Sequence, residues 1–393
     1  MSDDAIVIVD GARTPMGGLQ GALSPMTAPQ LGAIAIKEAL SRAKIDAADV
    51  EEVIMGCVLQ AGTKQGPARQ AAINAGIPTS TGAVTVNKLC GSGMQAVIYA
   101  HDQIKAGSCN IAIAGGMESM SNAPHVLPNA RGGIGTGDKQ IHDHMFLDGL
   151  QDAYTGRAMG TFAQETADKA GLTREQMDDY ALESLRRAKA AIDNGYLTPE
   201  TVAVTVTTRH SETVITDDEQ PHKAKVDKIP SLRPAFAKDG TITAANASSI
   251  SDGASALVLM TASEAAKRGL KPMAKIVAHS RQSQAPEEFT TAPVGSLTKL
   301  YAKTGWSKDD VDLFEINEAF AMVTMLTMQE HQLDHAKVNI HGGACAQGHP
   351  IGSTGSRIII SLMYALKHYG KQKGIASLCI GGGEALAVAI EIL

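Results

Sequence analysis

Two stretches of this chain repeat each other, and this internal repeat constrains the fold more than any other feature. Residues 46–56 resemble residues 307–317, and residues 109–118 resemble residues 375–384. Within each half, a strand pattern, a turn of small residues and a helical pattern lie between the two stretches. Such a repeat predicts two similar units that face each other. The turns at their strand ends should then converge on one site.

Strand-like apolar runs alternate with helical patterns along the whole chain, which indicates an α/β fold. The strand-like runs cover residues 6–9, 52–55, 83–86, 111–114, 203–206, 256–260, 276–279, 313–316, 338–340 and 375–380. The helical patterns cover residues 27–43, 69–75, 94–106, 155–170, 173–194, 319–331 and 353–368. A chain of 393 residues is also long enough for more than one domain.

One long segment stands outside the repeat. Residues 121–248 have no counterpart in it and are rich in Gly, Pro, His and charged side chains. We interpret this segment as an inserted loop domain that covers the site. Residues 1–120 together with residues 249–272 would then form the N-terminal α/β half, and residues 273–393 the C-terminal half.

Charge and composition argue against several classes of protein. Lys and Arg number 35 against 41 Asp and Glu, so the chain lacks the basic footprint of a nucleic-acid-binding protein. No apolar run approaches the length of a membrane span. The first residues, Met1-Ser2-Asp3-Asp4, are acidic where a signal or transit peptide would be basic, so we expect a cytoplasmic protein. Five cysteines in a chain of this length do not indicate a disulfide framework.

The most informative motif is Val84–Ala96, in which Cys90 ends a strand-like run and a helical pattern follows. Free cysteines are usually packing residues. A thiol at a helix start, however, meets unpaired backbone N–H groups and the helix dipole, which favour the nucleophilic thiolate. Gly91, Gly93 and Ala96 also fit a dinucleotide-binding fingerprint, but no acidic residue ends a strand about 20 positions later, so this interpretation is weaker.

Three further loops carry reactive groups at strand ends. Asn317 offers an uncharged amide, and His349 lies in a glycine-rich turn that is a poor place to bury an imidazole for packing. Cys379 precedes Gly381–Gly383, whose backbone N–H groups can approach and stabilise an oxyanion. Each residue alone could be a packing or turn residue. Cys345 and His349 could suggest a metal, but zinc normally needs three or four ligands, so we expect none.

In this order the motifs resemble those of the thiolase family. The stretches that carry the resemblance are residues 9–15, 85–96, 114–121, 239–248, 317–321, 348–352 and 379–383. They are collinear and span essentially the whole chain. The resemblance implies duplicated α/β halves in a layered α-β-α-β-α core with an inserted loop domain that serves coenzyme A binding and oligomerisation. It also implies a homo-oligomer, either a dimer or a tetramer.

The implied substrates are acyl-coenzyme A thioesters, with coenzyme A as substrate or product and no permanently bound cofactor. The implied reaction is the reversible cleavage of a 3-ketoacyl-CoA by CoA, or the condensation of two acetyl-CoA molecules to acetoacetyl-CoA. Cys90 would accept the acyl group, His349 would take its proton, and Cys379 would be the acid or base at the substrate α-carbon. Asn317 would hold a water in one oxyanion hole with His349, and the N–H groups of Cys90 and Gly381 would form the other.

Contacts with coenzyme A follow from the same resemblance. Ser248 would approach the pantetheine, Leu150, Phe236 and Ala319 would form an apolar wall, and His222 would meet the phosphates.

Met159 favours a short acyl chain, as in acetoacetyl-CoA thiolases. Ala158, however, stands where many short-chain members have histidine. A broader 3-ketoacyl-CoA thiolase of fatty-acid degradation is therefore the main alternative. A decarboxylating ketoacyl synthase fits less well, because Cys379 is the carbon-acid base of thiolases. A non-catalytic coenzyme A or lipid carrier would have no need for all the site groups.

Overall fold

A ten-stranded mixed sheet forms the centre of the protein in the computed structural model, which describes residues 4–393. The strand order is β12-β13-β14-β11-β1-β10-β5-β3-β4, with β2 paired to β10. The strands are β1 Ile6–Arg13, β2 Gly17–Gly18, β3 Glu52–Gly56, β4 Gly82–Val86, β5 Ile111–Ser119, β10 Ser251–Thr261, β11 Ala274–Ser283, β12 Leu313–Ile316, β13 Lys373–Ile380 and β14 Glu384–Ile392. Met1, Ser2 and Asp3, on which the expectation of a cytoplasmic protein rests, lie outside the described residues.

The sheet consists of two halves in which four strands share the same order and directions, and the first half has β4 as an additional edge strand. In the first, β3 runs parallel to β4 and β5, and β10 lies antiparallel between β5 and β1. In the second, β12 runs parallel to β13, and β14 lies antiparallel between β13 and β11. The halves join where β1 pairs with β11 over only two residue pairs. The duplicated α/β halves predicted from the repeat are therefore confirmed.

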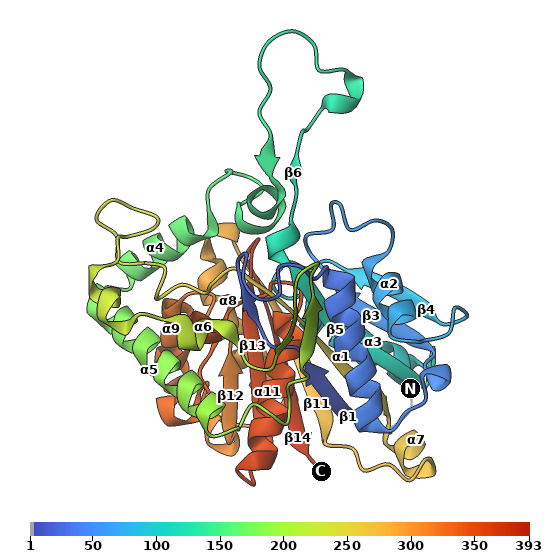
Figure 1. Cartoon of the computed structure of the whole chain (residues 1–393). Coiled ribbons are helices and arrows are strands. Elements are labelled where there is room, and N and C mark those ends of the chain that lie inside the picture. The colour runs from blue at the N-terminus through green and yellow to red at the C-terminus, as the bar shows by residue number, and fades with distance from the viewer. Residues whose placement is uncertain (1–3) are drawn as a thin grey trace.

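Helices complete the layers on both sides of each half-sheet (Figure 1). The helices of the two halves are α1 Ala28–Ala43, α2 Pro67–Asn74, α3 Ser92–Ala106, α7 Ala262–Lys267, α8 Ala292–Thr304, α9 Ala321–His331, α10 Ala344–Gln347 and α11 Thr354–His368. Helices α3 and α11 pack against each other and share one buried apolar cluster with strands of both halves. Helices α1 and α2 cover the outer face of the first half, and α8 lies on the outer face of the second.

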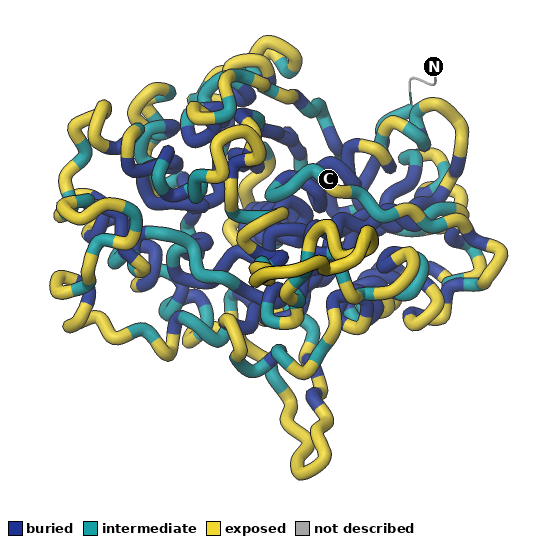
Figure 2. Tube along the Cα trace, turned by 90° about the horizontal axis from the view of Figure 1, so that it is seen from above, coloured by how far each residue is buried: buried dark blue, intermediate teal, exposed yellow. Residues whose placement is uncertain are grey.

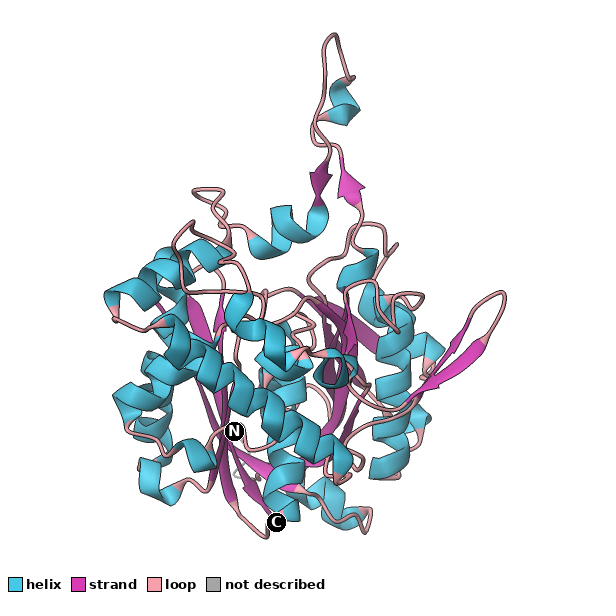
Figure 3. Ribbon diagram, turned by 60° about the vertical axis from the view of Figure 1, so that its left-hand side comes forward, coloured by secondary structure: helices cyan, strands magenta, loops and turns pink. Residues whose placement is uncertain are grey.

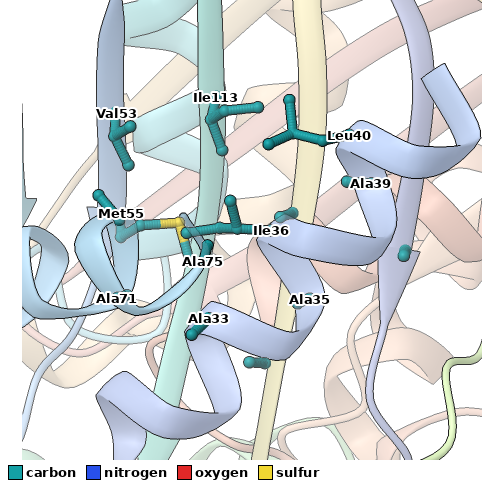
Figure 4. Close-up of a cluster of buried hydrophobic side chains, with 14 of the residues drawn as sticks. Ala33, Ala35, Ile36, Ala39, Leu40, Val53, Met55, Ala71, Ala75 and Ile113 are labelled. Carbon is teal, nitrogen blue, oxygen red and sulfur yellow. The ribbon is translucent and has the colours of Figure 1, made fainter. Parts of the chain in front are cut away.

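The outer layer of the first half shows why these sequences pack as they do. Ile36 and Leu40 of α1 reach Met55 and Ile113 on the strands, while Ala35 and its neighbouring alanines keep the helix close to the sheet (Figure 4). Each such aliphatic side chain stabilises the fold by about 1.5–3 kcal/mol when fully buried. Buried residues fill the centre of the molecule and exposed ones lie in the outer loops (Figure 2).

The segment between β5 and β10 forms a separate layer of helices and loops. Its main elements are β6 His125–Val126, β7 His142–Asp143, a π-helical turn Phe146–Leu150, α4 Met159–Lys169, α5 Arg174–Asp193, β8 Val204–Thr207, β9 Glu212–Ile215 and α6 Glu219–Lys223. The loop between β6 and β7 projects far from the body, and the β8–β9 hairpin also stands out (Figures 1 and 3). Helices α4 and α5 pack with α9 and with Cys379 at the end of β13. The proposed boundaries at residues 120, 248 and 272 stay a prediction.

Several elements differ from the sequence-based expectations. The patterns missed β14 and α8, and residues 338–340 form no strand but only a bridge from Val338 to Phe314. Strand β14 is buried on both faces, so its sequence lacks the alternation of polar and apolar residues that marks a half-buried strand. Helix α4 begins at Met159, later than expected, because Asp152 accepts hydrogen bonds from the backbone N–H groups of Tyr154 and Thr155 and holds them in a turn. Within residues 4–393 no helix combines the length and apolarity needed to cross a bilayer.

Candidate active site

The site lies where the N-terminal ends of α3 and α11 meet, and glycines make this approach possible. A Cβ atom on Gly93 would lie 2.9 Å from the backbone nitrogen of Ser356, and one on Gly116 would overlap the carbonyl oxygen of Gly352. Both positions exclude any side chain. Gly91 likewise leaves room for Ile380 of the other half. The glycines that resemble a dinucleotide-binding loop therefore serve the packing of the two halves.

Cys90 lies in a tight turn between β4 and α3. Leu89 adopts a left-handed conformation with φ of 48°, which is uncommon for a residue with a Cβ atom. The Ser92 hydroxyl stabilises the turn, because it accepts from the N–H of Lys88 at 2.9 Å and donates to the carbonyl of Leu89 at 2.6 Å. The N–H of Gly91 closes it by donating to the Lys88 carbonyl at 3.0 Å. This turn places the thiol at the start of the helix, as predicted.

The expectation that the helix start lowers the pKa of Cys90 is wrong. Burial raises the pKa of the Cys90 thiol to about 11, although the backbone N–H groups of Gly381 and of Cys90 itself hydrogen bond to the sulfur and oppose this shift. The charge of Glu118 raises it further. Cys90 is half-buried, and the apolar side chains packed around its sulfur disfavour the charged thiolate more than the two amide donors favour it. Cys90 is therefore a thiol at neutral pH and needs a base.

His349 is the residue predicted to be that base. Its Nδ1 lies 2.6 Å from Oγ1 of Thr354, whose hydroxyl donates to the carbonyl of Pro350 at 3.1 Å. Since this hydroxyl has one proton, it must accept from Nδ1–H, which leaves the lone pair on Nε2. The Nε2 atom is buried and has no protein partner within residues 4–393. Burial, assisted by the positive Arg357, lowers the pKa of His349 to about 3, so the imidazole is neutral.

Asn317 and Cys379 end two strands of the second half, β12 and β13. Both polar atoms of the Asn317 side chain are buried and make no hydrogen bond to a described residue. Buried polar groups normally have a partner, so this amide is available for a water or a substrate oxygen. Burial raises the pKa of the Cys379 thiol well above its ordinary value, and the sulfur of Cys90 raises it further. The two reactive sulfurs are therefore close enough to affect each other's ionisation.

A mostly apolar cavity of about 380 Å³ opens beside these groups. Of the residues predicted to contact coenzyme A, five line it: Leu150, Met159, Phe236, Ser248 and Ala319. His349 also lines it, and the Cys90 side chain packs in the same apolar cluster as Leu150 and Ile351 of the wall. His222 does not line the cavity and is exposed on α6. The lysines of a neighbouring hollow are instead Lys223, Lys225 and Lys228.

Comparison with known proteins decides the family. The thiolase N-terminal domain matches residues 6–263, and the thiolase C-terminal domain matches residues 270–392. The chain belongs to the thiolase family. Its relatives include an acetyl-CoA acetyltransferase of Cupriavidus necator, 45% identical over 98% of this chain and 99% of the relative. An acetyl-CoA acetyltransferase of Rhizobium meliloti is 45% identical over the full length of both chains.

Solved structures support the same assignment of this thiolase. A thiolase from Ascaris suum in complex with coenzyme A has a TM-score of 0.94 at 40% identity, and the match covers 99% of this chain and all of that one. The acetyl-CoA acetyltransferase of Bacillus anthracis has a TM-score of 0.97 at 39% identity and covers 99% of both chains. The layered fold with two related halves is thus shared over the whole length.

Two buried glutamates of the thiolase site were not predicted from the sequence. Glu118 accepts hydrogen bonds from the backbone N–H groups of Val58, Leu59 and Gly352 at 3.0, 3.0 and 2.8 Å. It therefore holds the loop of His349 against the first half. Burial raises the pKa of Glu118 to about 7. Glu118 lies within the buried strand β5, and an acidic residue in an otherwise apolar run was a signal, because a buried carboxylate needs partners.

The second buried carboxylate, Glu318, connects the inserted segment to the site. It accepts from the hydroxyls of Tyr180 and Ser184 on α5 at 2.9 and 2.8 Å. It also accepts from Nδ2 of Asn339 at 2.9 Å and from the N–H of Cys345 at 3.0 Å. Because Glu318 follows Asn317 directly, these four bonds fix the position of the Asn317 amide.

The described residues contain one group of metal-type ligands, and it lies away from the reactive sulfurs of this thiolase. It consists of His101, Asp102 and His279, toward the opposite end of α3 from Cys90. Both imidazoles already hydrogen bond to one oxygen of Asp102, at 2.9 and 3.1 Å. Cys345 and His349 do not form such a group.

Proposed function

We propose that this thiolase is an acetyl-CoA C-acetyltransferase that transfers an acyl group between carbon and the sulfur of coenzyme A through an acyl-Cys90 intermediate. The observation that carries the proposal is the surroundings of the Cys90 sulfur. Two backbone N–H groups point at it, and the site also holds a neutral imidazole with a free Nε2. The names of relatives at about 45% identity and the coenzyme A complex of the Ascaris suum structure support the same activity.

Cleavage begins when the Cys90 sulfur attacks the 3-keto carbon of the substrate while its proton passes to Nε2 of His349. The two events must be concerted, because the pKa of Cys90 lies far above that of His349. The bond between C2 and C3 breaks, and its electron pair goes to the acetyl-CoA enolate. The Cys379 thiol protonates the α-carbon of this enolate. The thiol of free CoA then gives its proton to the Cys379 thiolate and attacks the acyl-Cys90 carbonyl. The bond from that carbonyl to Cys90 breaks, the Cys90 sulfur takes its proton back from His349, and the shortened acyl-CoA is released.

The electrostatics fit this division of labour between the two cysteines. Because burial and the Cys90 sulfur raise the pKa of Cys379, it is protonated before cleavage and can act as the acid. In synthesis the deprotonated Cys379 would act in the reverse sense, as the base that takes the α-proton of the second acetyl-CoA.

The oxygen atoms also have donors. The N–H groups of Cys90 and Gly381 lie at the nucleophile, where the oxygen of a thioester bound to Cys90 would develop negative charge. Asn317, through a water, and His349 would hold the thioester oxygen of the second substrate. These roles, like the coenzyme A contacts of Ser248, follow from the family resemblance and are part of the proposal.

The deciding experiment is the intact mass and a peptide map after brief exposure to acetyl-CoA. We expect one acetyl group on Cys90 that disappears when CoA is added. Absence of the adduct in a protein that still binds CoA would contradict the proposal and favour a carrier.

We further propose a short acyl chain, because the sulfur of Met159 would lie 3.3 Å from a Cβ atom on Gly381 and so narrows the cavity beside the oxyanion hole. Relative kcat/KM values for acetoacetyl-CoA and longer 3-ketoacyl-CoA substrates test this. A preference for long chains would assign the enzyme to fatty-acid degradation instead.

A homodimer or homotetramer is part of the proposal as well. The edge strand β4 exposes Val84, and the loop between β6 and β7 exposes Ile134 and Ile141, and these surfaces suit contacts between copies. Light scattering at several concentrations tests this. The cytoplasmic location stays a prediction.

A further inference from the structure

The two N–H groups at the Cys90 sulfur come from opposite halves of the molecule. One belongs to Cys90, in the turn after β4, and the other to Gly381, in the turn between β13 and β14. Strands β4 and β13 are far apart in the sheet order, so no ladder of backbone hydrogen bonds sets the distance between these turns. Something else must hold the two donors at the spacing that one oxygen atom requires.

The turn that carries Gly381 is a short hairpin with Ile380 paired to Glu384 at its base, but its glycines have no side chain that reaches the first half. Gly382 and Gly383 adopt left-handed conformations, with φ of 84° and 88°, and neither has a side chain that could anchor the turn. A hydrogen bond of 2.8 Å from the N–H of Gln284 to the Gly383 carbonyl holds its far end. The first side chain after the glycines is that of Glu384.

Glu384 forms an ion pair with the other turn. One carboxylate oxygen lies 2.6 Å from Nζ of Lys88, and the other accepts from the Ser283 hydroxyl at 3.2 Å. Lys88 stands two residues before Cys90, and both of its backbone groups are bonded within the nucleophile turn, to Ser92 and Gly91. A displacement of Lys88 therefore moves Cys90 with it.

We propose that the ion pair between Lys88 and Glu384 is a positioning device that sets the distance between the N–H groups of Cys90 and Gly381. This inference rests on the proposed acyl transfer, in which these groups hold the oxyanion. Lys88 stands two residues before the donor Cys90, and Glu384 stands three residues after the donor Gly381. The contact of Gly91 with Ile380 holds the same two turns on their apolar side.

Because the ion pair is partly exposed, its loss should affect the rate of catalysis more than the stability of the fold. Its side chains are 22% and 31% exposed. A pair of this kind typically contributes only about 0–1 kcal/mol to folding. Oxyanion donors depend strongly on geometry, and loss of one donor outright slows catalysis roughly 100-fold or more. Loss of the pair should therefore leave the fold intact and slow the reaction.

The test uses Glu384→Gln, Lys88→Met and the exchanged double variant Lys88→Glu with Glu384→Lys. A matched control is available in the ion pair of Lys275 and Glu391, 2.8 Å long and 36% and 28% exposed, which joins the neighbouring strands β11 and β14. Glu391→Gln removes an ion pair of the same type from the second half without touching either turn.

The main measurement is the single-turnover rate of Cys90 acetylation at saturating acetyl-CoA, with KM measured separately. We expect Glu384→Gln and Lys88→Met to slow acetylation about 3- to 10-fold, less than the loss of a whole donor, with KM changed less than about twofold. The exchanged variant should recover most of the rate, and Glu391→Gln should match wild type. About 1 M KCl should slow wild type toward the single variants, because it screens the pair.

Alkylation of Cys90 by iodoacetamide across pH keeps this inference separate from the proposed function, because it needs only the thiol. A displaced Gly381 N–H raises the pKa of Cys90, so the midpoint of the alkylation profile should move upward in both single variants. If wild type takes no acetyl group, the proposed function fails, and the alkylation profiles alone decide on the ion pair.

Single variants that match Glu391→Gln in rate and alkylation, or an exchanged variant no faster than they are, would overturn the inference. If Glu384→Gln unfolds, Lys88→Met decides, because it leaves β14 unchanged.

Discussion

The two halves of this thiolase share one plan of strands and central helices but differ in what they carry at corresponding positions. Two residues before the start of its central helix, the first half has Cys90 and the second has Gly352. The repeat also aligns Gly56, the last residue of β3 in the first half, with Asn317, the residue directly after β12 in the second half. In the proposed mechanism the first half would contribute the nucleophile and glycines without side chains, and the second half would contribute the groups that bind substrate and transfer protons.

Close packing explains this asymmetry. A Cβ atom on Gly56 would lie 2.7 Å from the carbonyl oxygen of Gly352 and from the nitrogen of Gly93. The loops can therefore converge on Cys90 only if one partner at each contact has no side chain. A side chain such as that of Asn317 therefore does not fit at the corresponding position of the first half.

The strongest test of this comparison replaces Cys90 and Cys379 one at a time. Cys90→Ala should lower turnover by roughly 10⁴-fold or more, because no nucleophile remains. Cys379→Ser should still form acetyl-Cys90 but should not release label from α-tritiated acetyl-CoA into water. Intact mass and tritium release measure the two steps. Cys109→Ser, at a buried cysteine after α3, is the control and should change neither. Tritium release at the wild-type rate in Cys379→Ser would contradict the assignment of proton transfer to the second half.

The contact between the halves can be disrupted directly. Gly116→Ala should destabilise the protein by about 3 kcal/mol or more, because its Cβ atom would overlap the backbone of Gly352 in the His349 loop. Gly132→Ala is the matched control, since no atom lies within 4 Å of the added carbon. Urea unfolding measures both. Equal stability of the two variants would show that the halves can separate without cost.

The buried carboxylate of the first half gives stability an inverse dependence on pH. Its folded pKa of about 7 lies above the ordinary value of 4.5, so its contribution is complete below pH 4.5 and is lost as the pH rises through 7. Relative to Glu118→Gln, the unfolding free energy of wild type should fall by about 2 kcal/mol between pH 5 and pH 7. Denaturant titrations at several pH values measure it. A constant difference would mean that Glu118 is charged throughout this range.

The buried base of the second half should act in the opposite sense. His349 has a folded pKa of about 3 against an ordinary 6.5, so the unfolded chain binds a proton that the folded protein does not. The contribution of His349 to the free energy of unfolding is therefore complete above pH 6.5 and is lost as the pH falls. The loss should be about 1 kcal/mol between pH 7 and pH 5.5. His349→Asn should lack this loss in the same titrations. A parallel pH dependence in wild type and variant would show that the imidazole is accessible to solvent.

The sequence predicted what depends on local pattern. The repeat predicted two related halves, and the motifs around Cys90 and His349 predicted which loops meet. The ionisation of Cys90 could not be predicted in this way, because desolvation depends on every element that covers the thiol, whereas the helix start is visible locally. The partners of Glu118 and the ion pair of Lys88 with Glu384 join residues far apart in the chain, and no local pattern specifies them. Strand β14 was missed because burial on both faces removes the alternation that marks a strand.

The position of β10 has a consequence for synthesis on the ribosome. This strand lies between β1 and β5, yet residues 120–250, which include the inserted segment, separate it from β5 in the chain. At roughly 5–20 residues per second, the nascent first half waits about 7–26 s with β1 and β5 unpaired along the edges that β10 later fills. During that interval the emerging chain exposes apolar strand edges, so its yield in the cell should depend on chaperones that shield them until residue 261 has left the exit tunnel.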